Sequence, residues 1–292
     1  MQLEYFITAA ERGSFSQAAE QLYISQPAIS KQIHLLEEEW GVKLFSRKYH
    51  SISLTEAGEL MLEHAKLSKI SLQNALYRAK QIEHTPGKKF FSIGLFEHGN
   101  LRNLNRVLKE FSIANPGVSF SLENNNFFTP NEGLKTQKFD LIFILKNMLM
   151  NEFTVEEKPL FNARFIAYLS SGHPLASKPD LKFPDLSEEC FYIPTPRNSS
   201  LTYNTCLNIC LSNGFSIRDY RFVPNVETAV LAVRMGSGTV MLDDQVVIQQ
   251  ADDLIAVPTD TYTPVVMAWL KNSGNPLIPP VVQNILDVYT LL

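Results

Sequence analysis

A short segment near the N-terminus has the polar side chains that proteins use to bind the edges of DNA bases. Ile29, Ile33 and Leu36 recur at the helical period and define the buried face of a helix from about Gln26 to Glu39. The residues on the other face, and the one that can cap the helix, suit hydrogen bonds to bases or, for proline, contact with a thymine methyl group: Ser25, Gln26, Pro27, Ser30, Lys31 and His34. We therefore predict a recognition helix for the major groove.

Basic residues follow in a second segment. Residues 41–45 and 51–54 are predicted to be two strands, joined by residues 46–50. Arg47 and Lys48 lie in this connection, where they suit contacts with phosphates or the minor groove. Such contacts add affinity but little direct sequence information. The pattern is typical of a wing with a basic tip.

The element before the recognition helix must position it. Residues 16–22 predict a helix in which the small Ala19 permits close crossing, and Tyr23 with Ile24 forms the turn. For a lone helix pair, a hairpin with a merely solvated polar face would be the better interpretation. The adjoining basic wing favours DNA binding instead. We predict that residues 1–58 form a winged helix-turn-helix domain, mainly α-helical.

A long helix is predicted to follow this domain. Thr55 can cap it, and no glycine or proline interrupts the sequence from Glu59 to His84, after which residues 85–87 end the helix. Small or apolar residues recur at alternating spacings of four and three, a pattern typical of helix pairing: Met61, Ala65, Ser68, Leu72, Ala75, Ala79 and Ile82. The alternative is a helix packed on its own domain. We predict that residues 59–87 form a linker helix that dimerises.

Residues 88–292 alternate between β-rich and helical segments. Strands are expected over residues 90–96, 118–122, 140–145, 165–169, 191–193, 221–223, 239–242 and 265–270. A helix with Leu101, Leu104, Val107, Leu108 and Phe111 follows the first of them. Such alternation predicts α/β layers.

The N-terminal region closely resembles the LysR-type transcriptional regulators. The resemblance rests on the run FSQAAEQLYISQPAISKQI at residues 15–33, followed in the family's order and spacing by residues 35–38, Gly41, residues 44–45, Arg47 and residues 54–58. Looser matches continue at residues 173–176 and 236–242. The resemblance implies a sequence-specific regulator that binds double-stranded DNA at an interrupted palindrome in a promoter. It also implies assembly into a dimer and further into a tetramer, with RNA polymerase as another candidate partner.

The resemblance further implies a C-terminal domain like that of periplasmic binding proteins, with a small-molecule effector between two α/β subdomains. The chain would cross over near residues 161–164 and return near residues 262–267. Subdomain I would then comprise residues 88–162 and 267–292, and subdomain II residues 163–266.

Polar residues just before predicted helices are candidate effector contacts, because helix N-termini offer free backbone N–H groups. With their neighbours in the same loops, the candidates are Glu97, His98, Asn100, Thr195, Arg197, Ser199, Ser200, Glu227 and Thr228. Plain helix capping is the better interpretation of each Ser, Thr or Asn taken singly. Many family members have a small hydroxyl residue after the first strand, where this chain has Glu97-His98-Gly99-Asn100. We therefore expect a neutral, zwitterionic or amine-bearing effector rather than a dicarboxylate.

Length, charge and hydropathy limit the number of domains and the location of the protein. The 292 residues are enough for two or three domains, and the formal net charge of −4 leaves room for a local basic surface. No apolar stretch approaches the ~18 residues that cross a bilayer, and an amphipathic segment with Glu4 and Glu11 begins the chain. We expect a cytoplasmic protein with no membrane partner.

Catalytic and metal-binding motifs are not found in the sequence. There is no phosphate-binding glycine loop, HExxH or GxSxG motif, so we predict neither an enzyme nor a cofactor. Cys206 and Cys210 share a helix face and could form a redox pair or half a metal site, but small buried side chains are the favoured interpretation. The scattered histidines add no ligand spacing, so no metal is predicted. The alternative function is a ligand-binding module without DNA recognition. It is disfavoured by the matched residues Gln26, Ser30, Lys31 and Arg47.

Overall fold

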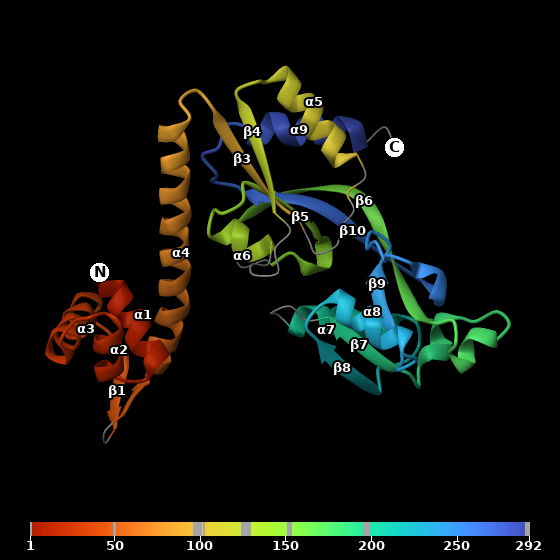
Figure 1. Ribbon diagram of the computed structural model, residues 1–292, viewed down its shortest axis with the longest axis horizontal. Coiled ribbons are helices and arrows are strands. Elements are labelled where there is room, and N and C mark those ends of the chain that lie inside the picture. The colour runs from red at the N-terminus through yellow and green to blue at the C-terminus, as the bar shows by residue number, and fades with distance from the viewer. Residues whose placement is uncertain are drawn as a thin grey trace. The chain divides into compact units, whose positions relative to one another are not determined.

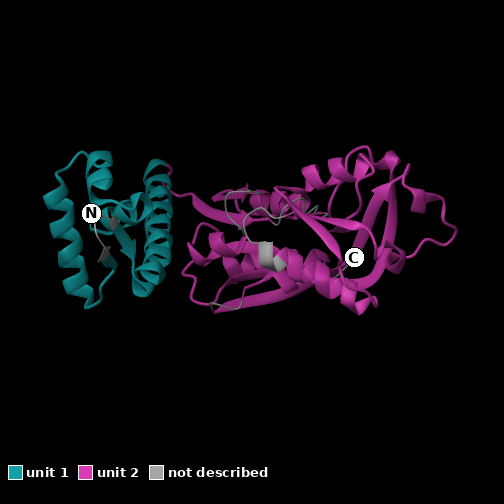
Figure 2. Ribbon diagram, turned by 90° about the horizontal axis from the view of Figure 1, so that it is seen from below, with its two compact units in different colours: residues 1–84 teal, residues 85–292 magenta. Residues whose placement is uncertain are grey.

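The computed structural model describes residues 2–48, 51–95, 101, 103–123, 130–150, 154–194 and 199–289, except for the side chains of residues 47, 48, 51 and 199–201. The chain divides into two compact units, Met1–His84 and Thr85–Leu292 (Figure 2). Within the described ranges, none of the helices has the length and apolar character to span a membrane.

The first unit consists of helices and one hairpin (Figure 1). Its elements are α1 (Gln2–Arg12), α2 (Phe15–Gln21), α3 (Gln26–Trp40), β1 (Phe45–Lys48), β2 (Ser51–Leu54) and α4 (Glu56–His84). Phe6 and Phe15 pack edge-on against Phe45, with ring centroids 5.7 and 5.3 Å away, and Ile29 and Leu44 are fully buried beside them. The core thus joins the first three helices to the start of the hairpin.

The hairpin begins later than the sequence predicted. Strand β1 starts at Phe45 rather than Gly41, so Arg47 and Lys48 lie within the strand, paired with Ile52 and Ser51, and not in its connecting loop. The expected strand over residues 41–45 was therefore wrong for residues 41–44 and right only at Phe45. Gly41 instead ends α3 in the left-handed conformation, with φ of 69°, and the polar groups after it bind side chains rather than a second strand.

The second unit is built on a six-stranded sheet of order β4-β3-β5-β10-β6-β9. Its strands are β3 (Lys89–Gly94), β4 (Val118–Glu123), β5 (Leu141–Leu145), β6 (Val155–Ser170), β9 (Val240–Asp243) and β10 (Leu254–Leu270). A second, parallel sheet pairs β7 (Cys190–Pro194) with β8 (Asp219–Val223), and the bridge Phe191–Thr239 connects it to the start of β9. The prediction of α/β layers is confirmed.

Helices cover both sheets. They are α5 (Leu104–Ala114), α6 (Pro130–Lys135), α7 (Ser199–Ser212), α8 (Val226–Arg234) and α9 (Ile278–Tyr289), with short 3-10 helices η1 (Lys146–Met148), η2 (Pro174–Ser177), η3 (Phe183–Leu186) and η4 (Ala251–Asp253). Strands β3, β4 and β5 with α5, α6 and α9 form one lobe, and β7, β8 and β9 with α7 and α8 form the other (Figure 1).

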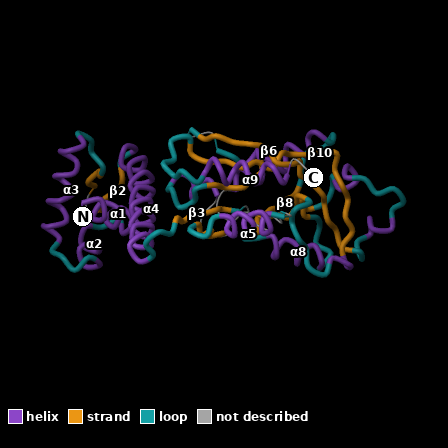
Figure 3. Tube along the Cα trace, turned by 90° about the horizontal axis from the view of Figure 1, so that it is seen from above, coloured by secondary structure: helices purple, strands orange, loops and turns teal. Residues whose placement is uncertain are grey.

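A long two-stranded ribbon runs through both lobes. Strands β6 and β10, of 16 and 17 residues, pair antiparallel along nearly their whole length (Figure 3). One end of β10 pairs with β5, and one end of β6 pairs with β9. The register shifts between Pro258 and Tyr262, opposite Arg164. At this irregularity, Arg164 Nε donates a hydrogen bond to the carbonyl oxygen of Thr259 at 2.6 Å. The arginine side chain thus supplies a partner for a backbone carbonyl where the strand pairing is interrupted.

Candidate DNA interface, pairing helix and effector domain

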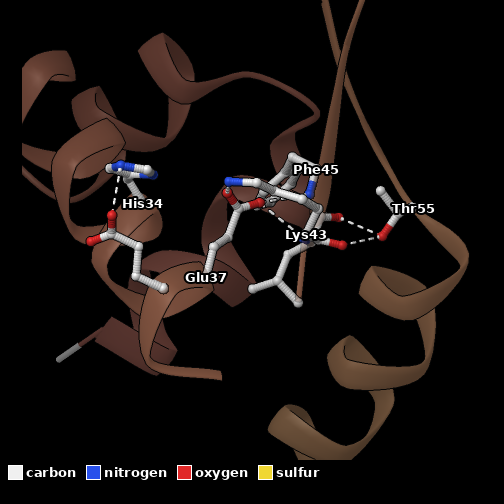
Figure 4. Close-up of polar contacts among 7 residues, drawn as sticks. His34, Glu37, Lys43, Phe45 and Thr55 are labelled. Atoms are coloured by element: carbon white, nitrogen blue, oxygen red, sulfur yellow. Dashed lines mark hydrogen bonds and ion pairs between the residues drawn. The ribbon is translucent and has the colours of Figure 1, made fainter. Parts of the chain in front are cut away.

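Helix α3 has the two faces that its sequence predicts. Ile29, Ile33 and Leu36 are buried, each with an exposed fraction of 3% or less. On and around the other face, Ser30 is half-buried and the remaining side chains are exposed: Ser25, Gln26, Pro27, Lys31 and His34. His34 Nε2 lies 3.3 Å from the carboxylate of Glu38, one turn further along (Figure 4). The face therefore consists of short and long hydrogen-bonding groups on a rigid, well-packed helix.

Ser25 occupies the N-cap position but does not cap the helix through its side chain. Its backbone is extended, and its carbonyl accepts from the N–H groups of Ala28 at 3.0 Å and Ile29 at 3.2 Å. Its hydroxyl makes no capping hydrogen bond. The predicted side-chain cap was wrong, because Pro27 removes one of the first N–H groups and the carbonyl serves two others. The hydroxyl at the start of the recognition helix therefore serves no capping role.

The segment that enters the wing is held from two sides. Glu37, on α3, accepts hydrogen bonds from Leu44 N at 2.8 Å, Phe45 N at 3.2 Å and Lys43 Nζ at 2.9 Å (Figure 4). Burial raises the pKa of Glu37, but these hydrogen bonds outweigh it and hold the pKa below its ordinary value. Thr55 donates its hydroxyl to Lys43 O at 2.6 Å and its N–H to Leu44 O at 3.0 Å. Glu37 was not among the functional residues predicted from the sequence. Its position next to Leu36, a core residue of the same helix, could have indicated that its carboxylate is partly buried and needs hydrogen-bond donors.

Helix α4 differs along its length. Ala65 is buried in the core of the first unit, and Met61 packs against that core. Ion pairs from Lys66 to Glu11, at 2.8 Å, and from Lys69 to Glu4, at 3.1 Å, hold this part of the helix against α1. The inclusion of Met61 and Ala65 in the pairing seam is therefore corrected, because tertiary packing uses this half of the helix.

From Ser68 onward, the predicted seam of α4 is exposed. Five predicted seam residues have exposed side chains: Ser68, Leu72, Ala75, Ala79 and Ile82. The exposed fractions of Leu72 and Ile82 are 63% and 62%. Leu76, 54% exposed, adds to this stripe and was missed, although its spacing of four from Leu72 could have shown it. An apolar stripe of this extent is unusual on a surface that meets only water.

Two of the nine predicted effector contacts have described side chains. Glu97, His98, Asn100, Thr195 and Arg197 lie outside the described residues, and the side chains of Ser199 and Ser200 at the start of α7 do too. Glu227 and Thr228 lie in the first turn of α8. Asn225, which was not predicted, caps this helix: its Oδ1 accepts from Thr228 N at 2.8 Å and from the Thr228 hydroxyl at 2.7 Å.

Asn147 links the two lobes. It lies in η1, directly after β5, and its Nδ2 donates to the hydroxyl of Thr205 on α7 at 3.2 Å. The hydroxyl of Thr263, on β10, lies 3.4 Å from its Oδ1. Sequence reasoning missed this residue because both partners are distant in the chain. One side chain thus connects both lobes and the ribbon between them.

Cys206 and Cys210 are buried side chains of low reactivity. Burial raises the pKa of Cys206 to about 12, with a smaller contribution from the neighbouring Cys210, and burial raises that of Cys210 to about 12 as well. At neutral pH both are thiols rather than the thiolates that react or bind metals. This environment supports the interpretation of both as small core residues.

A winged helix-turn-helix with an exposed polar recognition face, in one chain with a two-lobed α/β domain, defines a class of ligand-responsive DNA-binding regulators. Similarity to known proteins identifies the family within this class. Residues 1–59 match the family model for bacterial regulatory helix-turn-helix proteins of the lysR family, and residues 89–289 match that for the LysR substrate binding domain. The chain belongs to the LysR family. It is a DNA-binding transcriptional regulator with a domain for a small-molecule effector, and it is not an enzyme.

Individual relatives agree with this assignment. The SDS degradation transcriptional activation protein of Pseudomonas sp. is 30% identical over 177 residues, which are 61% of this chain and 58% of that protein. The regulator CatR of Pseudomonas putida is 26% identical over 281 residues and 94% of both chains. Among solved structures, full-length CbnR in complex with its target DNA is similar in fold, with a TM-score of 0.65 at 22% identity over 97% of both chains.

Proposed function

We propose that the chain binds an interrupted palindrome at a promoter as a dimer and reads bases with α3 in the major groove. The observation that supports this most is the exposed face of α3, where Gln26, Pro27 and Lys31 are accessible while Ile29 and Ile33 are buried. Gln suits adenine, Lys suits guanine or phosphate, and Pro suits a thymine methyl group. Ser25, Ser30 and His34 complete the proposed reading surface.

The wing is proposed to contribute affinity rather than base discrimination. Arg47 and Lys48 lie in β1 and are proposed to contact phosphates beside the groove. A protein with a formal net charge of −4 needs such a local basic surface to approach DNA. The proposed DNA-binding domain comprises residues 1–58.

Pairing is proposed to occur through the exposed stripe on α4. Leu72, Leu76 and Ile82 are more than half exposed, and burying a side chain of this size contributes about 1.5–3 kcal/mol. Two copies of the stripe would place two recognition helices at a fixed separation, which a palindromic site requires. On family membership we also propose a tetramer of two such dimers, and RNA polymerase as a partner of the DNA-bound form.

The effector is proposed to bind between the two lobes of residues 88–292, in subdomains of residues 88–162 with 267–292 and of residues 163–266. The ribbon of β6 and β10 and the link through Asn147 give the lobes a common frame against which a ligand could select one arrangement. We propose a neutral, zwitterionic or amine-bearing metabolite that contacts the starts of α7 and α8. Since such a regulator acts on chromosomal DNA in a bacterium, we place it in the cytoplasm.

The deciding experiment is footprinting of the purified chain on its own promoter and on that of the neighbouring operon. We expect two protected half-sites about one helical turn, or a multiple of it, apart. The same duplex with one half-site scrambled is the control and should bind more weakly. If the chain protects neither promoter, the alternative of a ligand-binding module without DNA recognition is favoured.

A further inference from the structure

We propose that Glu37 and Thr55 are positioning residues that fasten the segment Lys43–Phe45 between α3 and α4, so that the recognition helix, the wing and the pairing helix move as one body. We call these two side chains and the segment between them the clamp. The inference rests on the proposed use of α3 and the wing on DNA, and it assigns a role to residues that touch no base in that scheme.

The first half of the clamp is the carboxylate of Glu37. Its Oε1 accepts from the N–H groups of both Leu44 and Phe45, and its Oε2 accepts from Lys43 Nζ. Glu37 is 8% exposed and Leu44 is fully buried, so water cannot readily replace the bonds to the backbone N–H groups. The hairpin ladder begins only at Phe45, and Glu37 supplies the partner for the Leu44 N–H that the ladder does not reach. One carboxylate therefore fixes the start of the wing to the recognition helix.

The second half is Thr55, at the start of α4. Its hydroxyl accepts from Gly58 N at 2.9 Å, as an N-cap does, and donates to Lys43 O at 2.6 Å. Its N–H donates to Leu44 O at 3.0 Å. The same peptide segment is thus bound from α3 through its N–H groups and from α4 through its carbonyls (Figure 4).

Gly58 makes the close approach possible. A Cβ atom at this position would lie 2.1 Å from Leu44 O, which is too close for any residue but glycine. The first turn of α4 therefore lies directly against the backbone of the clamped segment. With the ion pairs from Lys66 and Lys69 to α1, the helix is held at its first turn and again in its third and fourth turns.

This rigidity has a consequence for DNA binding. In a dimer paired through α4, the separation of the two recognition helices depends on the angle between α3 and α4 in each copy. A buried donor left without its acceptor is costly, so each clamp bond resists a change in this angle. The clamp therefore sets how strictly the dimer distinguishes the correct spacing of half-sites from an incorrect one.

The test compares full-length variants for two properties. The first is hydrogen exchange of the Leu44 and Phe45 amides. The second is the ratio of affinities for the palindrome and for the same palindrome with one base pair inserted between its half-sites. Glu37→Ala removes the acceptors and Thr55→Val removes the hydroxyl, whereas Glu37→Gln and Thr55→Ser keep a hydrogen-bonding group at each position. Glu38→Ala is the matched control, because Glu38 is the adjacent carboxylate and lies 3.3 Å from His34 on the same helix, with no bond to Lys43–Phe45 in the described part of the chain.

We expect Glu37→Ala and Thr55→Val to speed exchange of these amides and to reduce the spacing ratio, each by about tenfold. In Glu37→Gln, Thr55→Ser and Glu38→Ala, the exchange rates of these amides and the spacing ratio should stay within about threefold of the values for the chain without substitutions. A domain that is merely less stable would bind both duplexes more weakly and leave their ratio unchanged, and this result would overturn the proposal. Unchanged amide exchange in both disruptive variants would also overturn it. If the chain without substitutions bound no duplex, the proposed function would fail. The exchange of the Leu44 and Phe45 amides in the variants would still show whether Glu37 and Thr55 hold this segment.

Discussion

Lys43 Nζ donates to Glu37 Oε2 across 2.9 Å, although the lysine side chain is 67% exposed and the glutamate side chain only 7%. The pair lies at the edge of the core, where the lysine neutralises a carboxylate that is otherwise surrounded by the backbone of the wing. Because the pKa of Glu37 in the folded chain lies below 4.5, its ordinary value, the ionised side chain contributes to the stability of the fold.

The first prediction concerns pH. The stabilisation from Glu37 is fully present above the unfolded pKa of 4.5 and is lost as pH falls through the lower folded-state pKa. In a Trp269→Phe background, the fluorescence of Trp40 reports unfolding of the first unit. We expect Glu37→Gln to lower the midpoint of thermal unfolding at about pH 7 and to lower it less as pH falls toward about 3. A difference that did not change over this range would contradict the lowered pKa.

The second prediction concerns base recognition by α3. Gln26→Ala and Ser30→Ala should each change base preference at a defined position, by about 1–3 kcal/mol where the contact is bidentate or well formed. Selection from randomised duplexes measures this directly. Glu39→Ala, an exposed substitution at the far end of the same helix, is the control and should leave preference unchanged. Unaltered preference in both Gln26 and Ser30 variants would remove the recognition role from α3.

The third prediction separates the wing from the recognition helix. Arg47→Ala should weaken binding to all sequences by a similar factor and reduce the slope of log affinity against log salt by about one phosphate contact. Titrations of the palindrome and of an unrelated duplex at several salt concentrations test this. Lys48→Ala is expected to behave in the same way. Loss confined to one base pair would show that Arg47 reads sequence instead.

The fourth prediction concerns pairing. Leu72→Glu places a charge in the exposed stripe of α4 in each copy, so sedimentation should show dissociation of the dimer and binding to the palindrome should be lost. Tyr77→Glu is the matched control, because Tyr77 is 64% exposed on the same helix but about 140° around it from Leu72. The control should remain paired. An intact Leu72→Glu dimer would move the interface to another surface.

Elements with a strong local period could be predicted from the sequence, whereas contacts between distant segments could not. The buried face of α3 follows from the spacing of Ile29, Ile33 and Leu36. The burial of Ala65 does not, since its environment is created by α1 folding onto α4. Likewise, β1 starts late because the backbone groups of residues 43–45 form hydrogen bonds with Glu37 and Thr55. The hydropathy pattern does not reveal these bonds.

In the second unit, too, buried apolar segments could be predicted, whereas the full length of the strands could not. Core strands such as β5 were predicted within a residue, because a short apolar run specifies a buried strand. Strands β6 and β10 extend about ten residues beyond the predicted segments 165–169 and 265–270, since polar residues such as Asn162 and Thr263 interrupt the apolar pattern while the ladder continues. The Asn225 cap shows a further limit: a helix start was expected at Glu227 and Thr228, but the capping residue was not distinguished from its neighbours.

The fifth prediction concerns the effector. A thermal-shift screen of the full-length chain against neutral, zwitterionic and amine-bearing metabolites should find compounds that raise the unfolding midpoint, and Ser199→Ala or Glu97→Gln should reduce that shift. Ser212→Ala, at the opposite end of α7, is the control, because its hydroxyl donates to Ile209 O at 2.9 Å within the helix. A ligand must also favour one arrangement of the lobes if it is to regulate, so Asn147→Ala should change the size of the response even where it leaves affinity intact. A shift that survives both Ser199→Ala and Glu97→Gln would place the effector elsewhere in the second unit.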